Sequence, residues 1–194
     1  MTKNRLEAFS DGVLAIIITI MVLEIKVPHS AELRAIEPLL PIIISYILSF
    51  IYVGIYWNNH HHMFHTVHRV SGGTMWANLH LLFWLSLIPF TTAWMGESHF
   101  AEAPMAMYGV VLFMNAIAYW VLQRTLIVKH DNHDLLARAV GKDLKGKLSP
   151  VLYLVAIPCA FVSPWIAGAI YTLVAFLWLV PDRRIERTLE SEEG

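Results

Sequence analysis

Long stretches of the chain contain no charged side chain, and this feature restricts the fold more than any other. Residues 38–57, 71–96 and 103–123 hold no Asp, Glu, Lys or Arg. Each stretch has the roughly 20 mostly apolar residues that a helix needs to cross a bilayer. Of the 194 residues, 57% are hydrophobic and 15% are charged, too apolar for a water-soluble domain of this size. The sequence therefore predicts an all-α integral membrane protein.

The number of spans depends on two further apolar regions. Residues 6–27 lack the small-residue pattern of a signal-peptide cleavage site, so they predict a retained first helix. Residues 148–181 are too long for one ordinary span. Ser163-Pro164 favours a tight turn between two helices there, with a single kinked helix as the alternative. We expect one domain, residues 1–194, with a linker at 125–147 and six transmembrane helices at 6–27, 38–57, 72–95, 103–124, 148–162 and 165–181.

The basic residues test this count through the positive-inside rule. If the N-terminus is cytoplasmic, the cytoplasmic segments hold 12 of the 14 Lys and Arg residues, all except Lys26 and Arg34. An odd number of spans would place the basic C-terminal segment on the opposite side. We therefore expect both termini in the cytoplasm, and cytoplasmic segments at 1–5, 58–70, 124–147 and 182–194.

The first apolar run contains two features that need an explanation. Ile16, Thr19, Ile20, Leu23 and Val27 fall on one stripe of a helix, at i, i+3, i+4 and i+7 spacing. Such a stripe can simply pack on a neighbouring helix, and a threonine can bond its hydroxyl back to its own helix. An acid near the bilayer also needs a partner or access to water. Ser10 and Asp11 could meet that need by capping the helix N-terminus.

Several short motifs resemble the transmembrane protein 175 family, which comprises organellar potassium channels and their prokaryotic relatives. The most specific is Arg-x-x-x-Phe-Ser-Asp on the first helix. The resemblance runs from Arg5 to Phe90, and the six-helix topology agrees over the rest. The residues that carry it are Arg5, Phe9, Ser10, Asp11, Trp57, His60, Phe64, Asn78, Leu79, Pro89 and Phe90.

The resemblance implies a potassium channel whose first helices line a central pore. The animal proteins carry two six-helix repeats and dimerise, so a single six-helix chain implies a homotetramer. Ile16 matches the narrow hydrophobic gate, Thr19 the layer of hydroxyls that contact the permeating ion, and Leu23 the next apolar ring. The chain has no glycine-rich carbonyl filter, and hydroxyl ligands imply only modest selectivity over sodium.

The resemblance also gives Asp11 a structural role. It implies that Trp57, His60 and Asn78 donate hydrogen bonds to the Phe9-Ser10-Asp11 segment, with Arg5 nearby. Such a network would hold the pore helix to its own bundle. The implied partners are the other copies of the chain in a homotetramer, membrane lipid and K⁺, with no cofactor, in a cell membrane of prokaryotic type.

A cluster of histidines supports a rival interpretation. His61, His65 and His68 share one helical face at the spacing of a metal site or a proton relay, although no acid on the same segment completes it. A histidine-dependent metal or proton-coupled transporter is therefore the alternative. The chain shows no phosphate-binding glycine loop, no Ser-His-Asp spacing and no nucleic-acid motif. We expect neither an enzyme nor a nucleic-acid partner.

Overall fold

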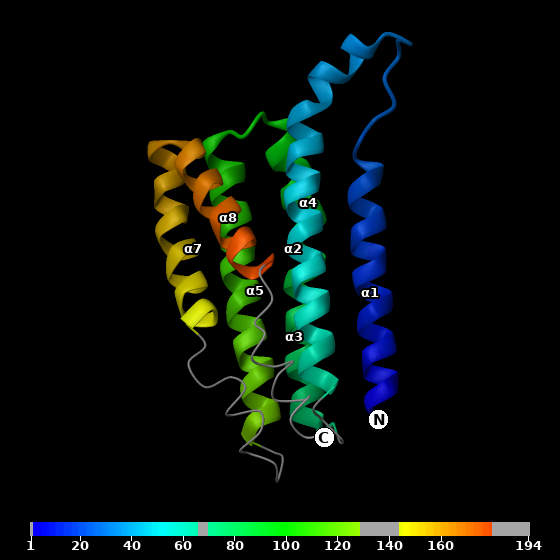
Figure 1. The fold of residues 1–194 in the computed structure, drawn as a ribbon, viewed down its shortest axis with the longest axis vertical. Helices are drawn as coiled ribbons and strands as arrows, with labels where there is room; N and C mark the ends of the chain where they lie inside the picture. The colour runs from blue at the N-terminus through cyan, green and yellow to red at the C-terminus, as the bar shows by residue number, and fades with distance from the viewer. Residues whose placement is uncertain (1, 66–69, 129–143, 180–194) are drawn as a thin grey trace, which may run out of the picture.

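The fold is an antiparallel bundle of helices. A computed structural model describes residues 2–65, 70–128 and 144–179, and these residues contain no strand. In Figure 1, α1 lies at one edge of the bundle and α7 and α8 lie at the other. The elements in chain order are α1 (Lys3–Leu23), the 3₁₀ helix η1 (Leu33–Leu39), α2 (Leu40–His65), α3 (Gly72–Ser86), α4 (Ile88–Glu97), α5 (Glu102–Val128), α7 (Leu144–Val162) and α8 (Pro164–Leu179).

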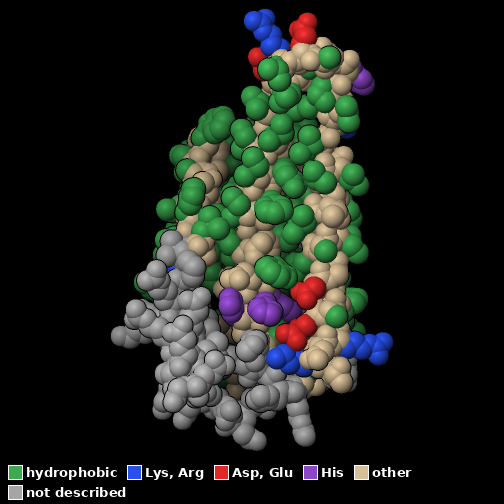
Figure 2. All heavy atoms as spheres, turned by 45° about the vertical axis from the view of Figure 1, so that its right-hand side comes forward, with side chains coloured by type: hydrophobic (Ala, Val, Ile, Leu, Met, Phe, Trp, Pro, Cys, Tyr) green, Lys and Arg blue, Asp and Glu red, His purple; other side chains and the backbone are tan. Residues whose placement is uncertain are grey.

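The lengths of these helices match a bilayer. Five helical segments are long and apolar enough to cross it, with α3 and α4 counted as one segment, Gly72–Glu97. The sixth helix, α8, is apolar but has only 16 residues. Hydrophobic side chains cover the middle of the face in Figure 2, and Lys, Arg, Asp, Glu and His side chains gather toward its ends. The protein is a multi-pass membrane protein, as the charge-free stretches predict.

The third span is broken, which differs from the single helix expected at 72–95. Leu87 separates α3 from α4 with φ −86° and ψ −11°. Pro89 explains the break, because it has no N–H to donate and its ring clashes with the carbonyl four residues earlier. The motif residues Pro89 and Phe90 therefore lie at the start of α4 rather than near the end of a longer helix.

The described part of the 148–181 region, residues 148–179, forms two helices rather than one kinked helix. Ser163 lies between α7 and α8, and Pro164 begins α8, where its missing N–H costs nothing. The backbone N–H of Ser163 still donates to Cys159 O at 2.8 Å, which closes the end of α7. Figure 1 shows the two helices side by side as a hairpin. The predicted turn is therefore present.

Two other helix ends differ from their expected positions. The first helix ends at Leu23, so Val27 lies outside the expected stripe. The second helix continues to His65, beyond the end expected at residue 57, so His60, His61 and His62 lie in its last turns. The centre of the expected linker, residues 129–143, lies outside the described residues.

Candidate functional site

One face of α1 is fixed to the bundle. Its buried residues recur every three or four positions and contact α2, α3 and α4. This spacing is the one that a helix uses to bury a single face. Ser10 is the polar member of the set, which otherwise consists of apolar side chains. The buried residues are Leu6, Ser10, Leu14, Ile17 and Met21.

The opposite face of α1 is apolar yet uncovered within one chain. Ile16 is 57% exposed, Ile20 44% and Leu23 77%, and Thr19 is also exposed. Ile16 and Ile20 line an open groove that α4 closes on its other side with the stacked rings of Phe90 and Trp94. A wide apolar face of this kind, left open by its own bundle, is available to lipid or to another copy of the chain.

Thr19 places one hydroxyl on this face. Its Oγ1 donates to the carbonyl of Ile16 at 3.0 Å, so the hydroxyl proton is used inside the helix. This is the back-bonding expected of a helical threonine, made to the residue three positions earlier. The hydroxyl oxygen keeps acceptor capacity, and the side chain is exposed. It can therefore accept from water or coordinate a cation.

A buried chain of hydrogen bonds joins α1 to α3 and α2. The amide of Asn78 donates from Nδ2 to Ser10 Oγ at 2.9 Å, and Ser10 donates to Leu6 O at 2.9 Å. His60 Nε2 lies 2.8 Å from Asn78 Oδ1, and it must be the donor because an amide oxygen only accepts. Ser10 and Asn78 are fully buried and His60 is 3% exposed. Asn78 thus links His60 to α1. His60 itself has no direct hydrogen bond to residues 9–11.

Asp11 lies beside this chain, at the protein surface. The indole N–H of Trp57 donates to Asp11 Oδ1 at 3.1 Å, and both residues are exposed. Within the described residues the salt bridge joins Lys26 to Glu97 at 3.2 Å, so Arg5 forms no ion pair with Asp11. Phe9 is 49% exposed and points away from the core. An N-cap role for Asp11 is excluded, because α1 begins two turns earlier, after Thr2.

The described histidines near the end of α2 have different neighbours. The rings of His61 and His62 lie 5.8 Å apart, with His61 also stacked on Trp57. The side chain of His65 and the whole of His68 lie outside the described residues. Among the residues that the structure describes, no three His, Cys, Asp or Glu side chains are placed to hold a metal ion.

His80 has a partner that the sequence did not suggest. Its Nε2 accepts from the indole N–H of Trp84 at 3.0 Å, one turn later on α3. The i, i+4 spacing of the two residues was a usable signal for this contact. His80 is therefore accounted for within its own helix.

The bundle defines a helical membrane protein, and comparison with known proteins narrows this class. Residues 5–89 match the family described as the endosomal/lysosomal potassium channel TMEM175. A potassium channel of Chryseobacterium sp. (strain P1-3) is 55% identical over 191 residues, which cover 98% of this chain and 100% of that protein. The chain belongs to the TMEM175 family. The resemblance seen between Arg5 and Phe90 is confirmed.

Two more relatives agree with this membership. The crystal structure of a lysosomal potassium-selective channel TMEM175 homolog from Chamaesiphon minutus matches with a TM-score of 0.78 and 30% identity, covering 92% of this chain and 96% of that one. The endosomal/lysosomal proton channel TMEM175 of Danio rerio is 29% identical over 132 residues, 66% of this chain and 24% of that protein. The family and these relatives are ion channels, not enzymes.

Proposed function

We propose that the protein is a potassium channel whose pore is lined by α1 from four copies of the chain. The observation that carries the proposal is the open face of α1, where Ile16, Thr19 and Leu23 are exposed although the opposite face is buried. The relatives named potassium channels, which align over nearly the whole chain, support the choice of ion.

The exposed side chains suit a hydrophobic gate with a polar collar. Ile16 and Leu23 are seven residues apart, so their rings would be stacked about 10 Å apart at 1.5 Å rise per residue. A ring of isoleucines can close a pore by excluding water, without a moving lid. Between the two rings, the Thr19 oxygens would replace part of the hydration shell of the ion, and no carbonyl filter would be needed.

The hydrogen bonds on the other side of α1 fit a bracing role. The chain from His60 through Asn78 to Ser10 is buried and fixes the helix rotation. Asp11 and Trp57 add a contact at the same end of α1. We assign these residues to positioning of the pore helix rather than to ion contact.

Ion flux from reconstituted protein tests the proposal. Vesicles with a potassium gradient should release K⁺ faster than vesicles with a sodium gradient release Na⁺, and the purified protein should have four times the mass of one chain. A parallel proton-flux measurement is needed because the Danio rerio relative is named a proton channel. A monomer without K⁺ flux, or flux of protons alone, would contradict the proposal.

The histidine-dependent transporter remains the other candidate function. The His61–His62 contact is the described feature nearest to it, and these two rings alone do not form a metal site. The same flux assay separates the alternatives, because a coupled transporter saturates and requires a proton or metal gradient, whereas a channel does not.

A further inference from the structure

A second cavity lies away from α1. It has a volume of about 260 Å³, is open to the surface, and is lined by residues of α2, α5, α7 and α8. None of its lining residues belongs to α1, so it is distinct from the proposed pore. It lies near the end of the bundle where α1 begins, because the last turns of α5 and the first turns of α7 contribute to it.

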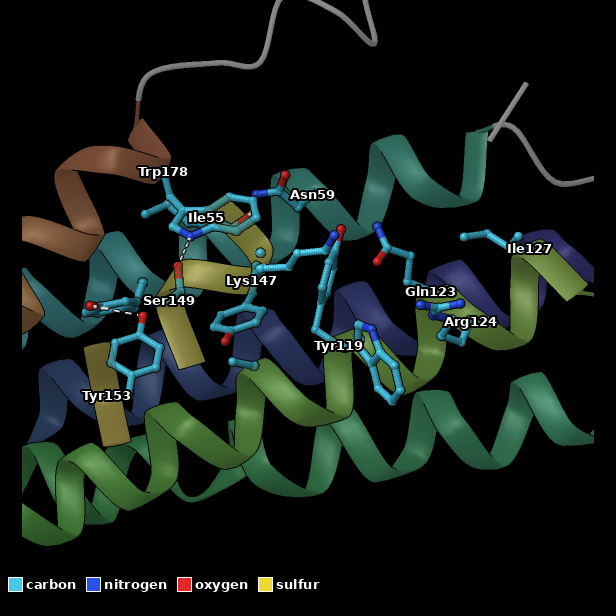
Figure 3. Close-up of a pocket in the computed structure, with 15 residues that line it drawn as sticks. Ile55, Asn59, Tyr119, Gln123, Arg124, Ile127, Lys147, Ser149, Tyr153 and Trp178 are labelled. Atoms are coloured by element: carbon cyan, nitrogen blue, oxygen red, sulfur yellow. Dashed lines mark hydrogen bonds between the residues drawn. The ribbon is translucent and has the colours of Figure 1, made fainter. Parts of the chain in front are cut away.

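Arg124 and Lys147 bring two positive charges to this cavity, and none of the lining residues that the structure describes is acidic. Arg124 comes from α5 and Lys147 from α7, and both side chains are exposed. The guanidinium of Arg124 lies 5.2 Å from the centre of the Trp120 ring, within cation–π distance, which orients it. Figure 3 shows Arg124 and Gln123 toward the end of the cavity that Ile127 occupies, with Tyr119 and Lys147 between them and Tyr153.

Several polar side chains in the cavity wall are already held by hydrogen bonds. Trp178 donates to Ser149 Oγ at 2.8 Å, and Tyr153 donates to Tyr52 Oη at 3.3 Å. Asn59 uses its Nδ2 to donate to Ile55 O at 2.8 Å, which leaves its side-chain oxygen as an acceptor. The first two contacts join α2, α7 and α8 around a space that needs little rearrangement to receive a ligand.

The exposed side of α7 that follows Lys147 is apolar. On α7, Val151, Leu154 and Val155 follow Lys147 within the next two to three turns, and they are 56%, 57% and 48% exposed. Basic residues at this level, with apolar helix faces above them, suit a ligand with an anionic head and hydrocarbon tails. Basic pockets between transmembrane helices on the cytoplasmic side are known to bind anionic lipid headgroups.

We propose that this cavity binds the phosphate headgroup of an anionic phospholipid. Arg124 can donate two parallel hydrogen bonds to a phosphate, and Lys147 supplies a second charge. The acyl chains would lie along the exposed apolar face of α7. A soluble phosphate compound shares the headgroup chemistry, but it would gain nothing from the apolar surface. The inference does not depend on the proposed pore.

Native mass spectrometry of the detergent-purified full chain can measure the binding directly. We expect phosphatidylglycerol to bind at least about tenfold more tightly than phosphatidylcholine, because each basic residue near an anionic lipid contributes on the order of 1 kcal/mol. The double substitution Arg124→Gln and Lys147→Gln should abolish this preference. The matched control, Lys26→Gln with Arg34→Gln, removes the same charge at the other end of the bundle and should retain it.

Two further measurements test whether the ligand is a lipid or a soluble phosphate, and whether it binds in the cavity. Glycerol phosphate at millimolar concentration should not displace phosphatidylglycerol, and displacement would assign the cavity to a soluble phosphate instead. Ala116→Phe, which fills the cavity from α5 without altering charge, should also weaken binding of the anionic lipid. The proposal would be overturned if the Lys26 and Arg34 control variant lost the preference for phosphatidylglycerol to the same extent. It would also be overturned if the Arg124 and Lys147 double variant kept that preference. Thermal unfolding in detergent alone confirms that each variant is folded.

Discussion

Trp57 on α2 donates its indole N–H to the carboxylate of Asp11 on α1, at 3.1 Å. The contact lies in the first half of α1, next to the buried Asn78–Ser10 hydrogen bond. Further along, Leu14, Ile17 and Met21 pack α1 against the bundle through apolar surface. Polar, directional contacts therefore hold one end of α1, while the end bearing Thr19 and Leu23 is held by packing. This asymmetry determines which substitutions should affect assembly and which should affect flux.

Substitutions in the buried chain should reduce stability more than substitutions at Asp11. Asn78→Leu leaves His60 Nε2 without an acceptor and Ser10 Oγ without a donor, and each unsatisfied buried group costs about 1–3 kcal/mol. Asp11→Asn keeps an oxygen that can accept from Trp57 at an exposed site, so its cost should stay below about 1 kcal/mol. Thermal unfolding and tetramer yield of the purified variants measure the difference.

His60→Ala tests the same chain from the other side. It should lower the unfolding temperature and tetramer yield without changing ion preference, because His60 contacts Asn78 rather than the open face of α1. If Asp11→Asn left the protein stable but removed its preference for K⁺, Asp11 would belong to the ion path, and the bracing role would be wrong.

Ile16→Asn should increase ion flux. If Ile16 forms the narrowest ring of the pore, an amide at this position lets water remain in the constriction and lowers the barrier to conduction. A reduction of about 1.4 kcal/mol would raise the flux about tenfold. Flux through proteoliposomes, normalised to the amount of tetramer, measures the increase.

Ile18→Asn, on a partly buried face of the same helix, is the control that should not raise flux. Equal flux from wild type and Ile16→Asn would argue against a gate at this position.

The sequence predicted the membrane class and the six apolar helices, because the length of a charge-free stretch shows directly whether a helix can cross a bilayer. The family resemblance implied contacts of Trp57 and Asn78 with the Phe9–Asp11 segment, and the Trp57–Asp11 and Asn78–Ser10 hydrogen bonds are present. It also implied a bond from His60 to that segment, but His60 bonds to Asn78 instead. Periodicity alone could not give these pairs, since it does not fix the register between neighbouring helices. Arg124 and Lys147 come together only because α5 and α7 pack side by side, and residues 125–146 separate them in the sequence.

Gly109→Ala should destabilise the bundle far more than Gly54→Ala. A Cβ at Gly109 would overlap the hydroxyl of Tyr171, which donates to Met105 O at 3.0 Å across α8 and α5. Such overpacking typically costs about 1–3 kcal/mol. A Cβ at Gly54 would meet no atom within 4 Å. Gly54→Ala should therefore leave the free energy of unfolding unchanged or raise it by roughly 0.5–1 kcal/mol, as expected for alanine in place of glycine within a helix.

Tyr171→Phe provides the test of that mechanism. It removes the hydroxyl that the new methyl group would strike, at the cost of one buried hydrogen bond. The double variant should therefore lose less stability than the two single losses added together, as a double-mutant cycle in thermal or urea unfolding would show. Strictly additive losses would mean that the contact with Tyr171 is not the cause.

Thr19→Ala should keep the tetramer and the current but bring the K⁺ to Na⁺ permeability ratio toward one. The Thr19 hydroxyl donates to Ile16 O at 3.0 Å, so its lone pairs remain for an ion on the exposed face. Four such oxygens are fewer ligands than stacked carbonyl rings, and they should discriminate modestly. The internal hydrogen bond contributes only about 0.5–1.5 kcal/mol, so its loss should not unfold the helix.

Thr19→Ser retains both the internal bond and the ligand, and should preserve most of the ratio. If Thr19 served only its own helix, neither substitution would shift the bi-ionic reversal potential. An unshifted potential in Thr19→Ala would therefore exclude Thr19 as an ion ligand.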